Sequence, residues 1–130
     1  IIGHSNGCEI GRRAIQQGKI SVRRFWMMAA AVDCDFERNG LNEYLHWHPN
    51  CEVVIYTSKR DYVLRYIATA SRWATFGLAG YGSLGAFGPK NVDPYVQPQV
   101  RVIARDDYTH GDYVMLHNLS KQINEMLDAQ

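Results

Sequence analysis

Apolar residues along the chain fall into short runs, separated by polar stretches that show helical spacing. Residues 25–32 are apolar throughout, and residues 52–57 and 100–104 are rich in β-branched side chains. These runs predict three strands, although the first is also compatible with a short buried helix, because periodicity alone does not separate the two. Ile1 and Ile2 are interpreted as the end of a further strand.

Helical spacing predicts helices over residues 8–17, 41–47, 62–73 and 113–127, with Gly18 at the C-cap of the first. Strands that alternate with helices imply crossover connections. We therefore expect an α/β fold: a mostly parallel sheet with flanking helices. The last helix carries one apolar face, made by Leu116, Leu119, Ile123, Met126 and Leu127.

Residues 74–98 interrupt this alternation with five glycines and several aromatic residues. Long loops of this composition are usually either functional, for example as lids, or disordered. We expect a lid or a pocket-lining loop here, with Trp73, Phe76 and Phe87 as its apolar wall.

Composition narrows the classes of function. The chain has 130 residues, the size of one domain, and a formal net charge of +1. Nucleic-acid binders normally show a basic excess, so no nucleic-acid partner is expected. Three widely spaced cysteines, Cys8, Cys34 and Cys51, indicate free thiols and slightly favour a cytoplasmic location.

The turn after the first strand carries the pattern G-x-S-x-G, as Gly3-His4-Ser5-Asn6-Gly7. A sharp strand-to-helix turn exposes the serine hydroxyl and leaves no room for side chains at the two glycine positions. The helix that follows directs its N-terminus at a developing oxyanion, and the amide of Asn6 would donate to it. The alternative interpretation is a glycine-rich turn with a helix-capping serine.

A nucleophilic serine needs a base, and the base needs an orienting carboxylate. Asp61 follows the strand at 52–57, and His110 follows the strand at 100–104. We therefore predict a triad of Ser5, Asp61 and His110. Asp33, after the strand at 25–32, is the alternative acid. Asp61 could also simply cap the next helix.

Other histidines offer weaker interpretations. His4 is expected to pack at the turn, because neighbouring residues there point apart. His117 is placed two turns into the last helix, at the surface or in packing. His46 and His48 could suggest a metal pair, but no cysteine or acidic cluster accompanies them. No metal site is therefore expected, and the predicted triad needs no cofactor.

These motifs together resemble the α/β-hydrolase superfamily, in its serine esterase/lipase branch. The resemblance rests on Gly3-His4-Ser5-Asn6-Gly7, on Ala31-Val32-Asp33, on residues 56–61 and on Thr109-His110-Gly111-Asp112. It covers nearly the whole chain, as the C-terminal part, 1–130, of a single such domain. It implies Ser5 as nucleophile, Asp61 as acid and His110 as base.

The same resemblance implies strands that precede this sequence, since the chain starts at Ile1 within a strand and lacks the family's early strands. The family's second oxyanion donor comes from a loop after an early strand. We therefore expect a truncated hydrolase, or one that an N-terminal half or a second chain completes. The expected substrate is a small-molecule ester or lipid. The alternatives are a non-catalytic hydrolase-like binding module, and a thioesterase or amidase.

Overall fold

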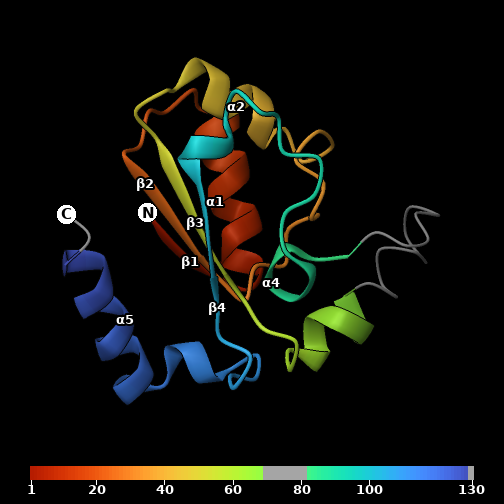
Figure 1. Ribbon diagram of the computed structural model, residues 1–130, viewed down its shortest axis with the longest axis vertical. Helices are drawn as coiled ribbons and strands as arrows, with labels where there is room; N and C mark the ends of the chain where they lie inside the picture. The colour runs from red at the N-terminus through yellow and green to blue at the C-terminus, as the bar shows by residue number, and fades with distance from the viewer. Residues whose placement is uncertain (69–81, 129–130) are drawn as a thin grey trace.

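The computed structural model describes residues 1–68 and 82–128, and its centre is one sheet of four strands (Figure 1). All three strand pairs are parallel, and the order is β1-β2-β3-β4. Helices flank the sheet, so the chain is of the α/β class, as its sequence predicts. The strands are β1 (Ile2–His4), β2 (Arg24–Met28), β3 (Glu52–Thr57) and β4 (Val100–Ala104).

The predicted strands at 52–57 and 100–104 are confirmed, but the strand predicted at 25–32 is too long. β2 ends at Met28, where Ala29 adopts a left-handed φ of 48°. The backbone then turns around the end of β1, and the amide of Ala31 donates to the carbonyl of Ser5 at 3.1 Å. Ala29, Ala30 and Val32 are all buried, so this apolar run reflects burial in a loop rather than a continued strand.

The predicted helix at 41–47 is confirmed, and the first helix begins two residues earlier than expected, at Asn6. The predicted helix at 62–73 is a π-helix, η1, up to residue 68, and its remainder lies outside the described residues. Within residues 1–68 and 82–128, no helix combines the length and apolarity needed to cross a bilayer. The helices are α1 (Asn6–Gln17), α2 (Leu41–Trp47), η1 (Val63–Ala68), α4 (Leu84–Phe87), η2 (Gln97–Gln99), η3 (Asp112–Val114) and α5 (Leu116–Asp128).

The C-terminal helix differs from its prediction in its bounds and in part of its buried face, which includes the predicted Met126 and Leu119. Extended backbone at Met115 (ψ 137°) separates the short η3 from α5. His117 therefore lies in the first turn of α5, exposed, and not two turns into the helix. The buried face carries Gln122, whose amide donates to the carbonyl of Tyr113, whereas Leu116 is 82% exposed.

Both faces of the central strands are buried, in two separate cores. Phe25 and Met27 point to the side covered by α1 and α2, whereas Trp26 and Met28 point to the side covered by α5. Figure 1 shows these helices on opposite sides of the sheet. Burial on both faces explains why β2 and β3 read as continuous apolar runs without alternation.

Gly18 is the C-cap of α1, as predicted, but the left-handed residue that ends the helix is Lys19. Gly18 keeps a helical φ of −78°, and Lys19 takes the left-handed conformation at φ 50°. The amide of Ile20 donates to the carbonyl of Ile15 at 3.0 Å. This six-residue closure is a Schellman motif with a lysine where glycine is usual.

Candidate active site

The structure brings the three residues of the predicted triad together at the carboxyl edge of the sheet. Ser5 directly follows β1, whereas Asp61 and His110 lie on the loops after β3 and β4. Ser5 Oγ is 2.9 Å from His110 Nε2. His110 Nδ1 is 3.0 and 2.9 Å from the two carboxylate oxygens of Asp61. Parallel strands end at one edge, which explains how residues 49 and 105 positions apart in the chain can meet.

The partners of His110 define where its proton lies. An ionised carboxylate only accepts hydrogen bonds, so Nδ1 of His110 carries the hydrogen that is donated to Asp61. In the neutral ring, Nε2 then holds a lone pair, and the hydroxyl of Ser5 donates to it. This arrangement can accept a proton from Ser5 as the hydroxyl attacks an electrophile.

The backbone at Ser5 is strained. Its φ of 53° and ψ of −123° lie in a region that residues with a Cβ rarely adopt. Its side chain makes no cap bond to α1, so the helix-capping interpretation of the serine is not supported. The strained turn instead directs Oγ to His110.

The two glycines of the motif have different surroundings. A Cβ on Gly3 would lie 3.0 Å from Cys8 Cα and 3.1 Å from Cys8 N, so only glycine lets α1 approach β1 this closely. A Cβ on Gly7 would meet nothing within 4 Å. The expectation that the turn excludes side chains at both positions is therefore correct for Gly3 and wrong for Gly7.

The start of α1 provides hydrogen-bond donors beside Ser5. The first amides of a helix have no intrahelical acceptors, and Asn6 is the first residue of α1. The amide of Cys8 is already used, since it donates to the carbonyl of Ser5 at 3.1 Å. The motif predicts the amide of Asn6, the first residue of α1, as the donor to an oxyanion.

Asp61 makes the contacts of both interpretations that the sequence offered for it. Its side chain is fully buried, and Oδ1 accepts the amide of Leu64 at 3.0 Å, as a helix cap does. The same carboxylate holds His110. A carboxylate oxygen has two lone pairs, so the two hydrogen bonds are compatible.

The alternative acid, Asp33, does not contact His110. It lies five residues beyond the end of β2, and its carboxylate accepts two hydrogen bonds of 2.8 Å from the Arg38 guanidinium. The sequence placed it directly after a strand because the apolar run continues to Val32. Because β2 ends at Met28, Asp33 does not directly follow a strand, which was the reason for considering it as the acid.

The loop that carries His110 is held by contacts that the sequence did not predict. The hydroxyl of Ser58 donates to the carbonyl of Tyr108 at 2.5 Å, which links the loops after β3 and β4. Asp112 accepts the amide of Thr109 at 2.7 Å and its hydroxyl at 2.9 Å. These two hydrogen bonds lower the pKa of Asp112 below its ordinary value of 3.8.

His4 also contacts this loop and does not merely pack at the turn. Its Nε2 lies 2.9 Å from the carbonyl oxygen of His110, and the two rings are 5.3 Å apart. No sequence pattern signals this contact, because it joins residues 106 positions apart.

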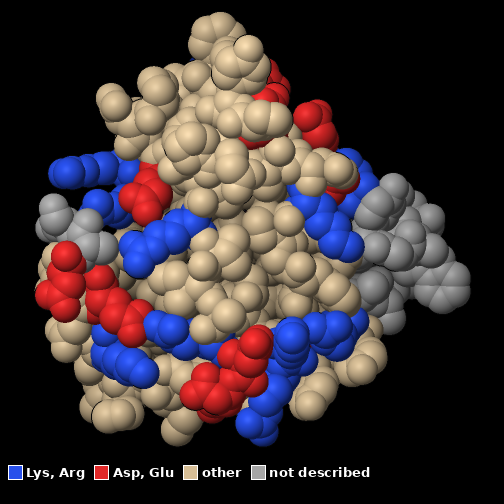
Figure 2. Space-filling model, in the orientation of Figure 1, with Lys and Arg blue, Asp and Glu red and all other residues tan. Residues whose placement is uncertain are grey.

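The cysteine and histidine side chains outside the triad were candidates for reactive or metal-binding groups. Burial raises the pKa of Cys8 to about 12, so its thiol stays protonated at neutral pH. His48 Nδ1 bonds the carbonyl of Tyr44. Among residues 1–68 and 82–128, no three His, Cys, Asp or Glu side chains gather as metal ligands would. On the face in Figure 2, basic and acidic side chains are intermixed.

Part of the loop expected to border the site is described, from residue 82 onward. The carbonyl of Gly85 accepts the amide of Ser58 at 2.8 Å, and its amide donates to Ala30 at 3.2 Å. The Phe87 ring is partly exposed and lies 4.6 Å from the Arg65 guanidinium. Trp73 and Phe76 lie outside the described residues.

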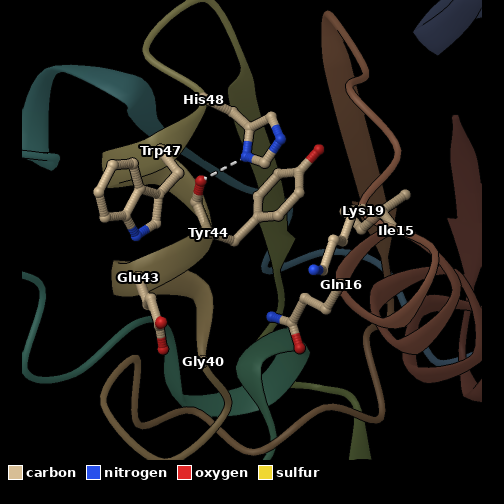
Figure 3. Close-up of a pocket in the computed structure, with 8 residues that line it drawn as sticks. All are labelled: Ile15, Gln16, Lys19, Gly40, Glu43, Tyr44, Trp47 and His48. Carbon is tan, nitrogen blue, oxygen red and sulfur yellow. Dashed lines mark hydrogen bonds between the residues drawn. The ribbon is translucent and has the colours of Figure 1, made fainter.

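A cavity of about 510 Å³ lies at the opposite end of α1 from Ser5 (Figure 3). Lys19 and Gln16 reach it from α1, and the exposed Trp47 and the stacked Tyr44–His48 pair reach it from the α2 side. It contains no serine or cysteine to serve as nucleophile.

Comparisons with protein-family models, with curated proteins and with solved structures found no match. In the candidate active site, the Ser5 hydroxyl is hydrogen-bonded to the His110 imidazole. The imidazole is in turn hydrogen-bonded to the buried carboxylate of Asp61.

Proposed function

We propose that this chain is the nucleophile-bearing part of an α/β-hydrolase that cleaves carboxylic esters. The observation that carries the proposal is the continuous hydrogen-bond chain from Ser5 Oγ through His110 to Asp61, with distances of 2.9 Å at both steps. A serine hydroxyl hydrogen-bonded to an oriented imidazole is the arrangement that activates it as a nucleophile.

The order of the three residues supports the hydrolase assignment. Ser5, Asp61 and His110 follow β1, β3 and β4 in that order, which is the chain order of α/β-hydrolase triads. The strained φ of 53° at Ser5 supports it independently, because a nucleophile on such a turn is held clear of the sheet.

In the proposed reaction, Ser5 Oγ attacks the ester carbonyl while His110 Nε2 takes the hydroxyl proton. Asp61 orients the ring and stabilises the imidazolium that forms. The amide of Asn6 donates to the tetrahedral oxyanion. The ester C–O bond then breaks, and His110 returns the proton to the leaving alcohol. Water, deprotonated by His110, hydrolyses the acyl-enzyme in the same way and frees Ser5.

An additional polypeptide segment is proposed along β1. Within the described residues, the outer edge of β1 has no partner strand, and Ile1 and Ile2 are 49% and 54% exposed. A groove of about 370 Å³ runs beside them, lined in part by Trp26 and Met126. Apolar edge strands are normally covered. An N-terminal half or a second chain would cover this edge and supply a second oxyanion donor.

The described part of the loop at 74–98 is proposed as a wall of the substrate pocket. Its hydrogen bonds to Ser58 and Ala30 hold it against the ends of β2 and β3, at the edge where Ser5 lies. Phe87 would contribute apolar contact to the acyl group.

The proposal is tested by labelling with a fluorophosphonate probe, which reacts with activated serines. We expect labelling of the protein and none of the Ser5→Ala variant. Ser120→Ala is the matched control, because Ser120 lies exposed in α5 with its hydroxyl bonded to Leu116. Labelling unaffected by Ser5→Ala, or a folded protein that is never labelled, would contradict the esterase.

Hydrolysis of a matched ester, thioester and amide of one acyl group then distinguishes the leaving group. We expect the ester to turn over fastest. A non-catalytic binding module would instead bind such compounds without turning any of them over.

A further inference from the structure

We infer that His4 is a positioning residue for the reaction proposed above, and that it acts on the backbone of His110. Its Nε2 lies 2.9 Å from the carbonyl oxygen of His110. This inference rests on the proposed function for its effect on rate, but the contact itself is independent of it.

The chemistry of the two partners defines the direction of this bond. A carbonyl oxygen only accepts, so Nε2 of His4 must carry the hydrogen. His4 is partly buried at the end of β1, where it pairs with Met28 in the sheet. The donor therefore stands on a strand that the sheet holds in place.

His4 supplies a second hydrogen bond between His110 and the turn of the nucleophile, besides the one between Ser5 Oγ and His110 Nε2. Asp61 holds the ring of His110, and Ser58 joins the loop of Asp61 to the loop of His110 through Tyr108. Neither contact ties His110 to the turn of the nucleophile. His4 does so, because it directly precedes Ser5 in the chain.

The hydrogen bond from His4 to His110 helps to fix the length of the Ser5 Oγ–His110 Nε2 hydrogen bond, along which the proton moves in the proposed reaction. Ser5 Oγ and His110 Nε2 belong to loops after different strands, so their 2.9 Å separation depends on the position of one loop relative to the other. A displacement of about 1 Å can lower a rate about 100-fold. His4 fixes the loop of the base relative to the turn of the nucleophile.

Three substitutions test this role. Glutamine carries an amide NH₂ at nearly the distance of Nε2 from the backbone, asparagine carries one too short to reach, and alanine carries none. We expect His4→Ala and His4→Asn to lower kcat about 10- to 100-fold for a p-nitrophenyl ester, with little change in KM. His4→Gln should stay within about threefold of the wild type. His117→Gln, at an exposed histidine of α5, is the control.

A second readout does not depend on turnover. The hydrogen on Nδ1 of His110, bonded to Asp61, should give a strongly downfield proton resonance that His110→Gln removes. We expect His4→Ala and His4→Asn to shift or broaden it and His4→Gln to preserve it. Unchanged kcat and resonance in His4→Ala would overturn the inference, and so would equal losses in His4→Ala and His4→Gln. If the wild type has no esterase activity but its resonance follows this pattern, the proposed function fails and the positioning role stands.

Discussion

Both carboxylate oxygens of Asp61 lie within hydrogen-bond distance of His110 Nδ1, at 3.0 and 2.9 Å. The Asp61 side chain is fully buried. The oxygen at 3.0 Å also accepts the amide of Leu64 at the start of η1. One side chain thus orients the base and anchors the following turn. These two roles can be separated by substitution, because asparagine preserves one of them better than the other.

Asp61→Asn should lower esterase activity much more than it lowers stability. Asparagine is as good a helix cap as aspartate, so we expect a loss of no more than about 1 kcal/mol in the free energy of unfolding. An amide cannot stabilise the imidazolium and favours the wrong tautomer, so kcat should fall about 10³- to 10⁴-fold. Urea denaturation and ester hydrolysis measure the two effects.

Asp61→Ala provides the comparison for that variant. It removes the cap as well, so it should destabilise the protein by about 1–2 kcal/mol more than Asp61→Asn does. Equal activity in Asp61→Asn and the wild type would show that this carboxylate does not support the base.

Replacing Ser5 should reveal the strain at the turn. Ser5→Gly and Ser5→Ala both remove the hydroxyl, but only glycine adopts φ 53° and ψ −123° without steric cost. We expect Ser5→Gly to be more stable than Ser5→Ala by about 1 kcal/mol in urea denaturation. An alanine variant that is the more stable of the two would mean that the turn is not strained.

The two glycines of the motif should respond oppositely to alanine. In Gly3→Ala, the new Cβ would press on the backbone of Cys8 at 3.0 Å, so we expect destabilisation by about 1–3 kcal/mol. Gly7 lies within α1 with open space around its Cα, so Gly7→Ala should stabilise the protein by about 0.5–1 kcal/mol. Thermal denaturation of the pair checks this. A large loss in Gly7→Ala would be the contradicting result.

Lys19→Gly should stabilise the end of α1. Lysine at φ 50° pays a steric cost that glycine avoids, and the greater freedom of glycine in the unfolded chain offsets part of the gain. We expect an increase of about 0.5–1 kcal/mol in the free energy of unfolding. The control is Gln17→Gly, at the last helical residue of α1, which should destabilise by up to about 1 kcal/mol. Stabilisation by both variants would indicate a cause other than the left-handed conformation.

The loop of His110 should weaken in acid through Asp112. The hydrogen bonds from Thr109 lower the pKa of Asp112 in the folded protein below 3.8. Its stabilising contribution is therefore complete above that value and is lost as the pH falls through the lower, folded-state pKa. We expect wild type to be more stable than Asp112→Asn near neutral pH, and this difference to shrink in acid. Urea denaturation at several pH values measures it, and a pH-independent difference would contradict the assignment.

The sequence predicted those features that depend on local pattern. The bounds of β3, β4 and α2 follow from runs of β-branched residues and from helical spacing with a breaker after it. Ser5, Asp61 and His110 could be named because each stands beyond the end of a strand, and parallel strands end at one edge.

Local patterns predicted the end of β2 and the buried face of α5 less well, because segments distant in the chain bury these residues. The apolar run after Phe25 continues past Met28, because the loop at Ala29 and Ala30 is buried by other segments. In α5, the polar Gln122 is buried as well as Met126, and its amide nitrogen donates to the carbonyls of Tyr113 and Asn118. A pattern of apolar residues indicates which side chains are buried, but it does not indicate which segments of the chain bury them.

The sequence by itself determined the α/β class, a mostly parallel sheet, and Ser5 and His110 as residues at its edge with Asp61 or Asp33 as their acid, because these follow from strand and helix periods and from the ends of strands. Only the tertiary structure decided that Asp61 and not Asp33 holds the base, that Gly7 is unconfined and that His4 reaches His110. Each of these depends on contacts between residues far apart in the chain, and no local pattern specifies such contacts.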